Sequence, residues 1–384
     1  MEKQTHVSWK LADYIYRSIP SPRSLHPPAV TGKLAHRPAS AGNLKPQTTF
    51  LILLRWLLPL MLAVGATGCG SMTAHLLARA PNRYPDWFDA EAPVTLAFSP
   101  KLLTNFTAQA VAVGPPAAQL SYRVVEPADY ALKITSTNWL DHGRKEFQFD
   151  FRATVPGRSN AWTAAPRGTV ILLHGYGLAQ FSMMPWALRL GEAGWRCVLV
   201  DLRGHGRSTG KQIYYGKYET RDLSQLLDAL SRDGQLQAPV AALGESYGAA
   251  LALRWKAVDP RIQSAVALAP YASLSNAVLN IRHDYAPWMP AWIVRSGLIR
   301  LPQVLDLPPA ELDTTTVLRR QPVRALLVAG ADDQIAPVPE VEKLQTLMLP
   351  GSRLQVVPKA THESLTYFFP DLLGPVLTWL DRGN

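Results

Sequence analysis

The chain has 384 residues, enough for one large domain or two smaller ones. Hydrophobic residues make up 47% of it and charged residues 18%, which is typical of a globular protein with a sizeable core. The net charge of +10 is uneven, because residues 1–68 carry eight Lys and Arg against two Asp and Glu, while the rest carries 31 against 27. That near balance excludes a basic nucleic-acid-binding surface, so no nucleic-acid partner is expected.

The N-terminal part has the features of a targeting segment. Residues 1–49 are basic and rich in Pro and Ser, without apolar periodicity, and we expect disorder there. The apolar run Trp56–Ala66 follows Arg55; it has the length of a signal-peptide core and is too short to span a bilayer. The small residues Ala66, Thr67 and Gly68 then lead into Cys69. Residues 1–68 are therefore predicted to be a leader and signal peptide.

The step from small residues into Cys69 resembles the lipobox of bacterial lipoproteins, although Ala66 stands where Leu is usual. The resemblance implies cleavage before Cys69, lipidation of its thiol and a lipid-anchored protein of the cell envelope. Gly70 after the cysteine, in place of Asp, implies the outer membrane of a Gram-negative cell. An inner-membrane anchor and cleaved export to the periplasm stay open as alternatives. Residues 69–118 carry Pro and Ala without clear period and are predicted to be a tether with irregular structure.

Residues 119–384 alternate between strand and helix patterns. "QLSYRVV" and "KEFQFDFRATV" alternate apolar and polar residues, as half-buried strands do. Short continuous apolar runs, typical of buried parallel strands, are "GTVILLHG", "CVLVD", "VAALG", "SAVALAP", "RALLVAG" and "RLQVVP". Helical patterns between them are "MPWALRLGEAGW", "YETRDLSQLLDALSRD", "AALALRWKAVD" and "PEVEKLQTLML". This order predicts an α/β fold, a mostly parallel twisted sheet with helices on both faces, whose ligands bind at the carboxyl ends of the strands. Cys197, at the start of "CVLVD", is predicted to be a small core residue.

Two stretches fit the serine-hydrolase pattern G-x-S-x-G, around Ser208 and around Ser246. The pattern counts only where a strand ends at the first Gly and a helix begins at once, because that sharp turn exposes the hydroxyl above the sheet. Gly244 directly follows "VAAL", and the helical "GAALALRW" starts just after Ser246. Ser208 lies seven residues beyond its strand and is followed by loop residues. Ser246 is therefore the predicted nucleophile.

A serine nucleophile needs a base, and the base needs an acid that orients it. Only His283 and His362 follow Ser246, and His362 comes after the last strand and before the final helix, where this fold places its base. Asp332 and Asp333 lie just past the strand "RALLVAG" and are the two candidates for the acid.

An oxyanion hole needs two backbone N–H groups aimed at the developing negative charge. One is predicted to be that of Tyr247, the residue after the nucleophile. The other is predicted to be that of Tyr176, in the glycine-containing loop after "VILLHG". His174, in the same loop, precedes the serine in the chain and is expected to brace the loop rather than to act as the base.

Five stretches, "LLHGYG", "DLRGHGRS", "GESYGAA", "GADDQIAP" and "THE", follow one another as in the α/β-hydrolases. Over roughly residues 120–384 the chain resembles that superfamily, and "HGYG", "DLRGHGRSTG" and "GESYG" resemble its serine aminopeptidase and monoacylglycerol-lipase-like branch. The resemblance implies that Asp333, three residues after Gly330, is the acid in preference to Asp332, and that Ser208 belongs to a structural loop. No cofactor is expected, and no metal-ligand spacing is present in the sequence.

Residues 271–323 lie where this family inserts a cap, and they contain Trp288 and Trp292 among other apolar residues. We expect a small helical lid whose tryptophans line an acyl pocket, with a packed cover of no substrate role as the alternative. The resulting hypothesis is a serine hydrolase that cleaves carboxylic esters, of acyl or lipid type, through an acyl-enzyme, with a lipid anchor holding it at a membrane. A serine peptidase of the aminopeptidase type and a non-catalytic binding lipoprotein on the same fold are the alternatives.

Overall fold

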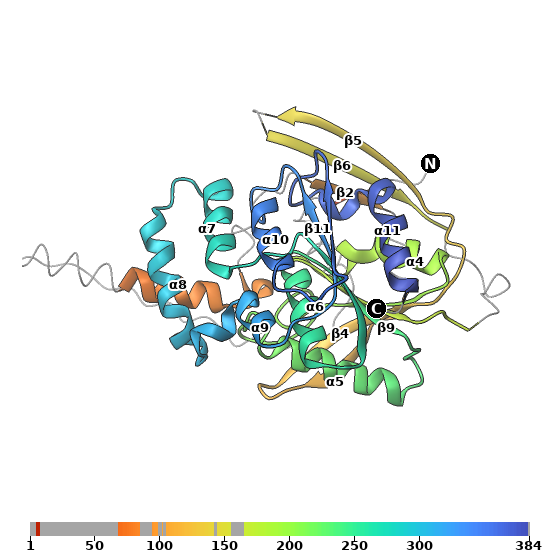
Figure 1. Ribbon diagram of the computed structural model, residues 1–384, viewed down its shortest axis with the longest axis horizontal. Helices are drawn as coiled ribbons and strands as arrows, with labels where there is room; N and C mark the ends of the chain where they lie inside the picture. Colours follow the sequence, from red (N-terminus) through yellow and green to blue (C-terminus); the bar gives the residue numbers. More distant parts are fainter. Residues whose placement is uncertain are drawn as a thin grey trace, which may run out of the picture.

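The computed structural model describes residues 5–7, 68–84, 94–98, 102, 105–141, 144–154 and 165–382 (Figure 1). The centre of the molecule is an eight-stranded sheet in the order β12-β11-β10-β9-β7-β8-β4-β3. Its strands are β3 Gln109–Val113, β4 Ala118–Val125, β7 Thr169–Leu173, β8 Arg196–Val200, β9 Val240–Glu245, β10 Ile262–Leu268, β11 Leu326–Gly330 and β12 Arg353–Val357. Strands β8, β7, β9, β10, β11 and β12 pair in parallel, and β4 is antiparallel to both of its neighbours. The predicted strand runs and the mostly parallel sheet are confirmed.

Helices cover both faces of this sheet, which is why its central strands are continuous apolar runs. Along β7 the side chains of Val170 and Leu172 join one buried cluster, and those of Ile171 and Leu173 join another. The first cluster includes residues of α4 Met184–Glu192 and α11 Phe369–Asp381. The second includes residues of α5 Glu219–Arg232 and α6 Tyr247–Val258. Helix α10 Val338–Gln345 packs on β11, and short 3-10 helices are found at Pro81–Arg83, Gln180–Met183 and Leu365–Tyr367.

A second sheet has the strand order β1-β2-β6-β5. It consists of β1 Thr5–Val7, β2 Val94–Phe98, β5 Lys133–Asp141 and β6 Arg144–Arg152, the last two forming a long antiparallel ribbon at the top of Figure 1. The alternation in "KEFQFDFR" is explained by its burial, because Phe147, Phe149 and Phe151 are buried and pack near Tyr367 and Phe368. The ribbon therefore packs against the C-terminal part of the fold, at Tyr367 and Phe368.

The segment expected to be an irregular tether contains regular structure. Residues 68–78 are helical, and β2 and β3 also fall within 69–118, so the main sheet begins before residue 119. The helix is held in place because the carbonyl of Leu77 accepts a hydrogen bond from the Tyr215 hydroxyl, and that of Ala78 accepts one from the Ile213 N–H. Small side chains on the helix allow it to approach the segment of Ile213 and Tyr215 closely. The helix has no apolar periodicity, so the sequence did not predict it. Apart from residues 5–7 and Gly68, the predicted leader lies outside the described residues.

The predicted lid, residues 271–323, is helical. It consists of α7 Leu274–Tyr285, α8 Ala291–Leu305, a 3-10 turn at Pro309–Leu312 and α9 Thr314–Arg320. In Figure 1 α7 and α8 form a pair at one end of the molecule, beside the helix of residues 68–78. Among the described residues, no helix combines the length and the apolar character that crossing a membrane requires.

Candidate functional site

Ser246 lies on a sharp turn between β9 and α6. Its backbone has φ 49° and ψ −110°, a strained conformation for a residue with a side chain. The turn depends on its two glycines: a Cβ at Gly248 would lie 2.2 Å from the carbonyl oxygen of Leu173, and one at Gly244 would lie 2.1 Å from that of Gly248. Because larger residues cannot fit at either position, the G-x-S-x-G pattern here has a direct steric cause, and it lifts the Ser246 hydroxyl above the carboxyl edge of the sheet.

The structure brings Ser246, His362 and Asp333 into one chain of hydrogen bonds. His362 Nε2 is 2.8 Å from Ser246 Oγ, and His362 Nδ1 is 2.8 Å from Asp333 Oδ2. The other carboxylate oxygen of Asp333 accepts hydrogen bonds from the backbone N–H groups of Ile335 and Ala336, at 2.8 and 2.7 Å. Both oxygens of Asp333 are thus engaged, and its side chain is fully buried. The geometry is that of a nucleophile, a base and an acid that fixes the orientation of the base.

Charges around His362 favour its protonated form. Burial alone would lower the pKa of the imidazole, but the carboxylate of Asp333, through its charge and its hydrogen bond, raises that pKa well above the ordinary value of 6.5. Glu363 and Glu245 add smaller upward contributions to the same pKa. The surroundings of His362 are therefore able to stabilise a protonated imidazole, the form that a base takes when it accepts a proton.

Two backbone N–H groups at the site are available to a ligand. Among the described residues, neither the N–H of Tyr247 nor that of Tyr176 donates a hydrogen bond. Tyr247 is the first residue of α6, where N–H groups have no acceptor within the helix. Tyr176 lies in a turn closed by the Leu178 N–H on the carbonyl of Gly175, and Gly177 adopts the φ of 74° that the turn requires. These are the two groups that the sequence predicted for an oxyanion hole.

His174 braces this loop. Its Nδ1 is 2.8 Å from the carbonyl oxygen of Gly175, and its Nε2 is 3.0 Å from the backbone nitrogen of Leu202. Complete burial lowers the pKa of His174 to about 4, so the ring is neutral, with Nδ1 donating and Nε2 accepting. The ring ties the loop after β7 to the loop after β8 and makes no contact with Ser246 Oγ.

Sequence reasoning missed Glu245, although it lies inside "GESYG" itself. Its buried carboxylate accepts hydrogen bonds from the N–H of Gly175, at 3.2 Å, and from the hydroxyl of Ser182, at 2.8 Å, and it is also bonded by Thr366. Burial raises the pKa of Glu245, and these hydrogen bonds oppose that shift. The side chain thus joins the loop of Tyr176 to the segment that follows His362. The only sequence signal was a charged residue at a position where the strand is otherwise apolar.

A second contact that sequence reasoning missed links the lid to the loop of the base. The hydroxyl of Tyr285, at the end of α7, donates a hydrogen bond to the carboxylate of Glu363, the neighbour of His362. The loop itself is held by Ser364, whose hydroxyl oxygen accepts the N–H of Thr361 at 3.0 Å. The position of the lid is therefore connected to the surroundings of His362 through one side chain.

The rejected candidates lie away from the triad geometry. Ser208 is buried, donates to the carbonyl of Asp201 at 2.5 Å and accepts from the N–H of Ser121 at 2.8 Å, so its hydroxyl serves the structure of a turn. Asp332 points to the surface and pairs with Lys145. His283 is exposed on α7 beside Asp284.

The two lid tryptophans differ from expectation. Trp288 and Trp292 leave 78% and 54% of their surface exposed, so they do not line an enclosed pocket. Trp288 lies in the turn between α7 and α8, and Trp292 lies on the side of α8 opposite its buried residues. Cys69 is a free, partly buried cysteine in the first turn of helix 68–78, and its lipidation stays a prediction.

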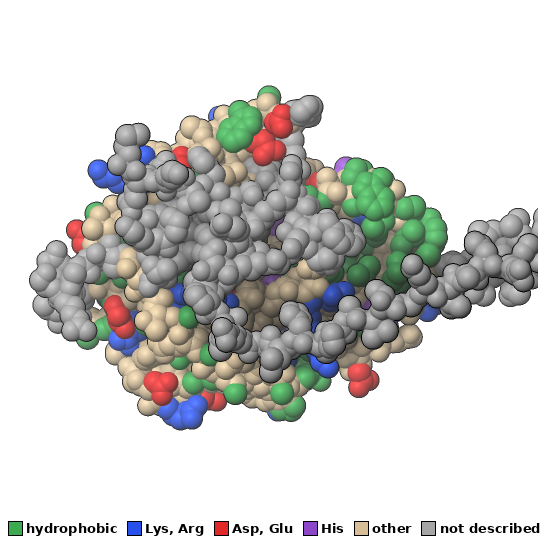
Figure 2. All heavy atoms as spheres, turned by 180° about the vertical axis from the view of Figure 1, so that it is seen from behind, with side chains coloured by type: hydrophobic (Ala, Val, Ile, Leu, Met, Phe, Trp, Pro, Cys, Tyr) green, Lys and Arg blue, Asp and Glu red, His purple; other side chains and the backbone are tan. Residues whose placement is uncertain are grey.

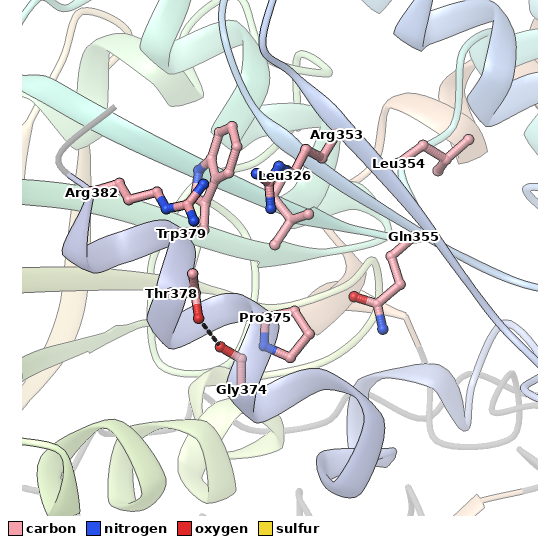
Figure 3. Close-up of a pocket in the computed structure, with 9 residues that line it drawn as sticks. All are labelled: Leu326, Arg353, Leu354, Gln355, Gly374, Pro375, Thr378, Trp379 and Arg382. Atoms are coloured by element: carbon pink, nitrogen blue, oxygen red, sulfur yellow. Dashed lines mark hydrogen bonds between the residues drawn. The ribbon is translucent and has the colours of Figure 1, made fainter.

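A cavity of about 500 Å³ lies elsewhere, between β12 and α11 (Figure 3). It is lined by Leu326, Arg353, Leu354, Gln355, Gly374, Pro375, Thr378, Trp379 and Arg382. Leu326 and Arg353 are the first residues of their strands, whereas Ser246 follows the last residue of its strand, so the cavity is at the opposite edge of the sheet. Within the described parts of the chain, no group of three or more His, Cys, Asp or Glu side chains is placed to hold a metal ion.

Comparison with known proteins relates this site to a family. Residues 164–327 match the family described as serine aminopeptidase, S33. The chain is 24% identical over 180 residues to the uncharacterized protein YqkD of Bacillus subtilis, and 32% identical over 117 residues to a monoacylglycerol lipase of Mycolicibacterium smegmatis. These matches cover 46% and 28% of this chain and 58% and 40% of the relatives, so the chain spans less than two thirds of either relative.

A third relative, the 2-hydroxy-6-oxo-6-(2'-aminophenyl)hexa-2,4-dienoic acid hydrolase of Metapseudomonas resinovorans, is 23% identical over 251 residues, which cover 56% of this chain and 84% of that protein. Among solved structures, an esterase of Pyrococcus furiosus aligns with a TM-score of 0.53 at 22% identity, over 74% of this chain and 94% of the esterase. That likeness shows a shared fold. Together with the sheet and the strand-to-helix serine turn, it shows that the chain has the α/β-hydrolase fold, and residues 164–327 are similar to the S33 family.

Proposed function

We propose that this protein is a serine hydrolase that cleaves carboxylic esters through a covalent acyl-enzyme. The observation that carries the proposal is the hydrogen-bonded chain from Ser246 through His362 to Asp333, with each bond at 2.8 Å. A hydroxyl is a weak nucleophile, and this arrangement supplies a base in contact with it and an acceptor that orients the base. The names of the esterase and lipase relatives point to the same reaction class.

In the first half of the reaction, Ser246 Oγ attacks the ester carbonyl while its proton passes to His362 Nε2. The carbonyl oxygen becomes an oxyanion, and the backbone N–H groups of Tyr176 and Tyr247 stabilise it by donating hydrogen bonds to it. The buried carboxylate of Asp333 stabilises the imidazolium. The intermediate collapses when the C–O bond of the ester breaks, and His362 returns the proton to the departing alkoxide, which leaves as the alcohol.

In the second half, water takes the place of the alcohol. His362, again neutral, accepts a proton from the water, whose oxygen attacks the acyl carbon. The same two N–H groups hold the second oxyanion. The acid is released when the bond to Ser246 Oγ breaks and the imidazolium returns its proton to that oxygen, which restores the starting state.

An apolar acyl ester suits the surroundings better than a peptide with a free amine. A peptidase of the aminopeptidase type needs a free carboxylate to hold the substrate ammonium. In the lid, Asp284 pairs with His283, Glu311 pairs with both Lys217 and Arg320, and Asp313 is hydrogen-bonded by Thr315. Among the described residues, Asp306 is the lid carboxylate that forms neither an ion pair nor a hydrogen bond. The lid instead exposes aliphatic and indole side chains. We therefore assign acyl or lipid esters as the substrate class.

The test is hydrolysis of p-nitrophenyl esters of graded chain length beside alanine p-nitroanilide, for the wild type and Ser246→Ala. We expect ester turnover that Ser246→Ala abolishes, and little release from the anilide. Faster release from the anilide would replace the esterase by a peptidase. Saturable binding of the ester without turnover in the wild type would favour the non-catalytic binding protein.

We further propose that the protein is lipid-anchored through Cys69 at the cell envelope, in the outer membrane of a Gram-negative bacterium. The support is the sequence of short apolar run, small residues and cysteine. A diacylglycerol thioether together with an N-acyl chain would be enough for stable anchoring, which takes more than one lipid signal. Mass spectrometry of the mature N-terminus should find lipid-modified Cys69 as the first residue; an unmodified cut elsewhere would contradict this proposal.

A further inference from the structure

The outer face of the lid exposes large apolar side chains. Trp288 and Ile299 are 78% and 76% exposed, Trp292 is 54% exposed, and Ile281 is 38% exposed. In Figure 2 hydrophobic side chains gather at the end of the molecule that carries the lid. Single exposed apolar residues are ordinary on a soluble protein, but several large ones at one end of the molecule indicate an interaction surface. We call these four residues the lid face.

Helix α8 has one well-packed side and one exposed apolar side, so the exposure of the lid face does not result from loose packing of the helix. Val294, Gly297 and Leu301 form its buried stripe. Trp292 and Ile299 are seven residues apart on the opposite stripe, where a surface helix normally carries polar side chains. Arg295 lies between them on that same exposed stripe. An outward stripe of Trp, Arg and Ile is typical of a helix that rests on a membrane surface.

The charges around the lid face are basic. Residues 274–305 contain Arg282, Arg295 and Arg300 and a single acid, Asp284, which is paired with His283. Within the described chain, neither Arg295 nor Arg300 takes part in an ion pair. Apolar and indole groups that enter the interface, flanked by unpaired arginines, match the acyl chains and anionic headgroups of a phospholipid layer.

The N-terminal helix joins the lid at this end of the molecule. A Cβ at Gly70 would lie 2.2 Å from Ser296 Oγ, and a Cβ at Gly297 would lie 2.5 Å from Thr73 Cγ2, so helix 68–78 and α8 are in close contact. The apolar run Trp56–Ala66 ends four residues before Gly70. Four residues reach at most about 14 Å. Whether the anchor is that run or a lipid on Cys69, it is therefore attached beside α8.

Two independent observations support a docking surface: the apolar lid face with its arginines, and the attachment of the N-terminal anchor beside α8. We propose that the lid face docks onto an anionic phospholipid bilayer, and that helix 68–78 holds the lid at the membrane. The inference does not depend on catalysis, so it goes beyond the proposed esterase activity. It replaces a long free tether by a rigid attachment that fixes which side of the molecule meets the bilayer. Apolar substrate dissolved in the membrane would then reach the lid without crossing water.

The test uses the full-length chain with vesicles of phosphatidylglycerol and phosphatidylethanolamine that carry bromine on their acyl chains, which quench nearby indoles. We expect quenching in the wild type and the loss of a clear part of it in the double variant Trp288→Phe, Trp292→Phe. The matched control is Trp139→Phe, because Trp139 is 46% exposed on β5, outside the lid, and should leave the quenching unchanged. In the uncleaved chain, Trp56 in the apolar run keeps reporting anchoring in every variant.

Affinity supplies a second readout. Ile299→Ser should weaken vesicle binding about tenfold, as expected from the loss of one buried aliphatic side chain, whereas Leu140→Ser, at a residue 71% exposed on β5, should not. Vesicles of phosphatidylcholine alone should bind less than the anionic ones. Equal quenching in wild type and the double Phe variant would overturn the proposal. A dimer that Ile299→Ser dissociates, without lipid quenching of Trp288 and Trp292, would assign the face to a second copy and overturn it as well. Ser246→Ala should dock like the wild type, so a failed esterase assay does not affect this result.

Discussion

Replacing Asp333 by Asn tests how the site orients its base. In the wild type one carboxylate oxygen of Asp333 accepts from the N–H groups of Ile335 and Ala336, and the other faces His362 Nδ1. Asn has one oxygen, and those two N–H groups require it. The amide NH2 must then point at Nδ1 and donate to it, which leaves the proton on Nε2, where the hydroxyl of Ser246 needs an acceptor.

The expected cost is large because the wrong tautomer cannot accept the serine proton. Such a change in a Ser-His-Asp triad lowers kcat about 10,000-fold, which corresponds to about 5 kcal/mol of transition-state stabilisation. The assay is the steady-state kinetics of a p-nitrophenyl ester, with folding checked by thermal unfolding. The matched control is Asp332→Asn, which removes only an exposed pair with Lys145 and should change kcat less than twofold, as expected for a weak surface ion pair.

The result that refutes this reasoning is an Asp333→Asn enzyme within tenfold of the wild type. A large loss in Asp332→Asn with a small one in Asp333→Asn would move the acid by one residue. Equal losses in both variants would show that the loop, and not the orientation of His362, is what matters.

Three further predictions concern the surroundings of the triad. Because kcat/KM requires neutral His362, whose pKa is raised, activity should rise with pH through a pKa above the ordinary 6.5. Glu363→Gln removes a nearby negative charge and should shift this rise in activity to lower pH. A shift to higher pH in this variant would contradict the charge argument. Glu245→Ala leaves the Gly175 N–H and the Ser182 hydroxyl without their acceptor. We expect kcat to fall about 10- to 100-fold with little change in KM, and the free energy of unfolding to fall by about 1–3 kcal/mol. A change confined to KM would place Glu245 in substrate binding instead. Gly248→Ala places a Cβ 2.2 Å from the Leu173 carbonyl oxygen and should destabilise the fold by about 2 kcal/mol or more. The control is Gly374→Ala in α11, where a Cβ meets nothing within 4 Å, and this change should not lower the melting temperature. Equal melting temperatures for the two variants would mean that the turn relaxes freely.

The parts of the fold that sequence reasoning predicted well are those where local pattern and tertiary role coincide. Strands such as β7 are buried on both faces, so their continuous apolar runs are visible in the sequence. Ser246 and His362 stand at fixed places relative to such strands, and Gly244 and Gly248 are required sterically. The spatial arrangement then follows from topology, because the ends of parallel strands meet at one edge of the sheet.

The parts that sequence reasoning missed depend on contacts between distant segments. Helix 68–78 is held by carbonyl contacts to Tyr215 and Ile213 and by small residues against α8, and neither leaves an apolar period in the sequence. The resemblance to a family with an inserted cap placed Trp288 and Trp292 in a pocket, and the usual burial of aromatic residues favoured a packed cover instead. Their exposure, which neither reading predicted, is a property of the turn and the helix face. The role of Glu245 became visible only when Gly175, Ser182 and Thr366 met around one carboxylate.

The most direct measurement of the central claim is covalent labelling with a fluorophosphonate, followed by mass spectrometry of the labelled peptide. A serine activated by a neighbouring imidazole reacts with this reagent, whereas an ordinary turn serine does not. We expect one label per chain, on Ser246, and none on Ser246→Ala or on Ser208. A wild-type chain that stays unlabelled, or a label that persists in Ser246→Ala, would contradict the claim.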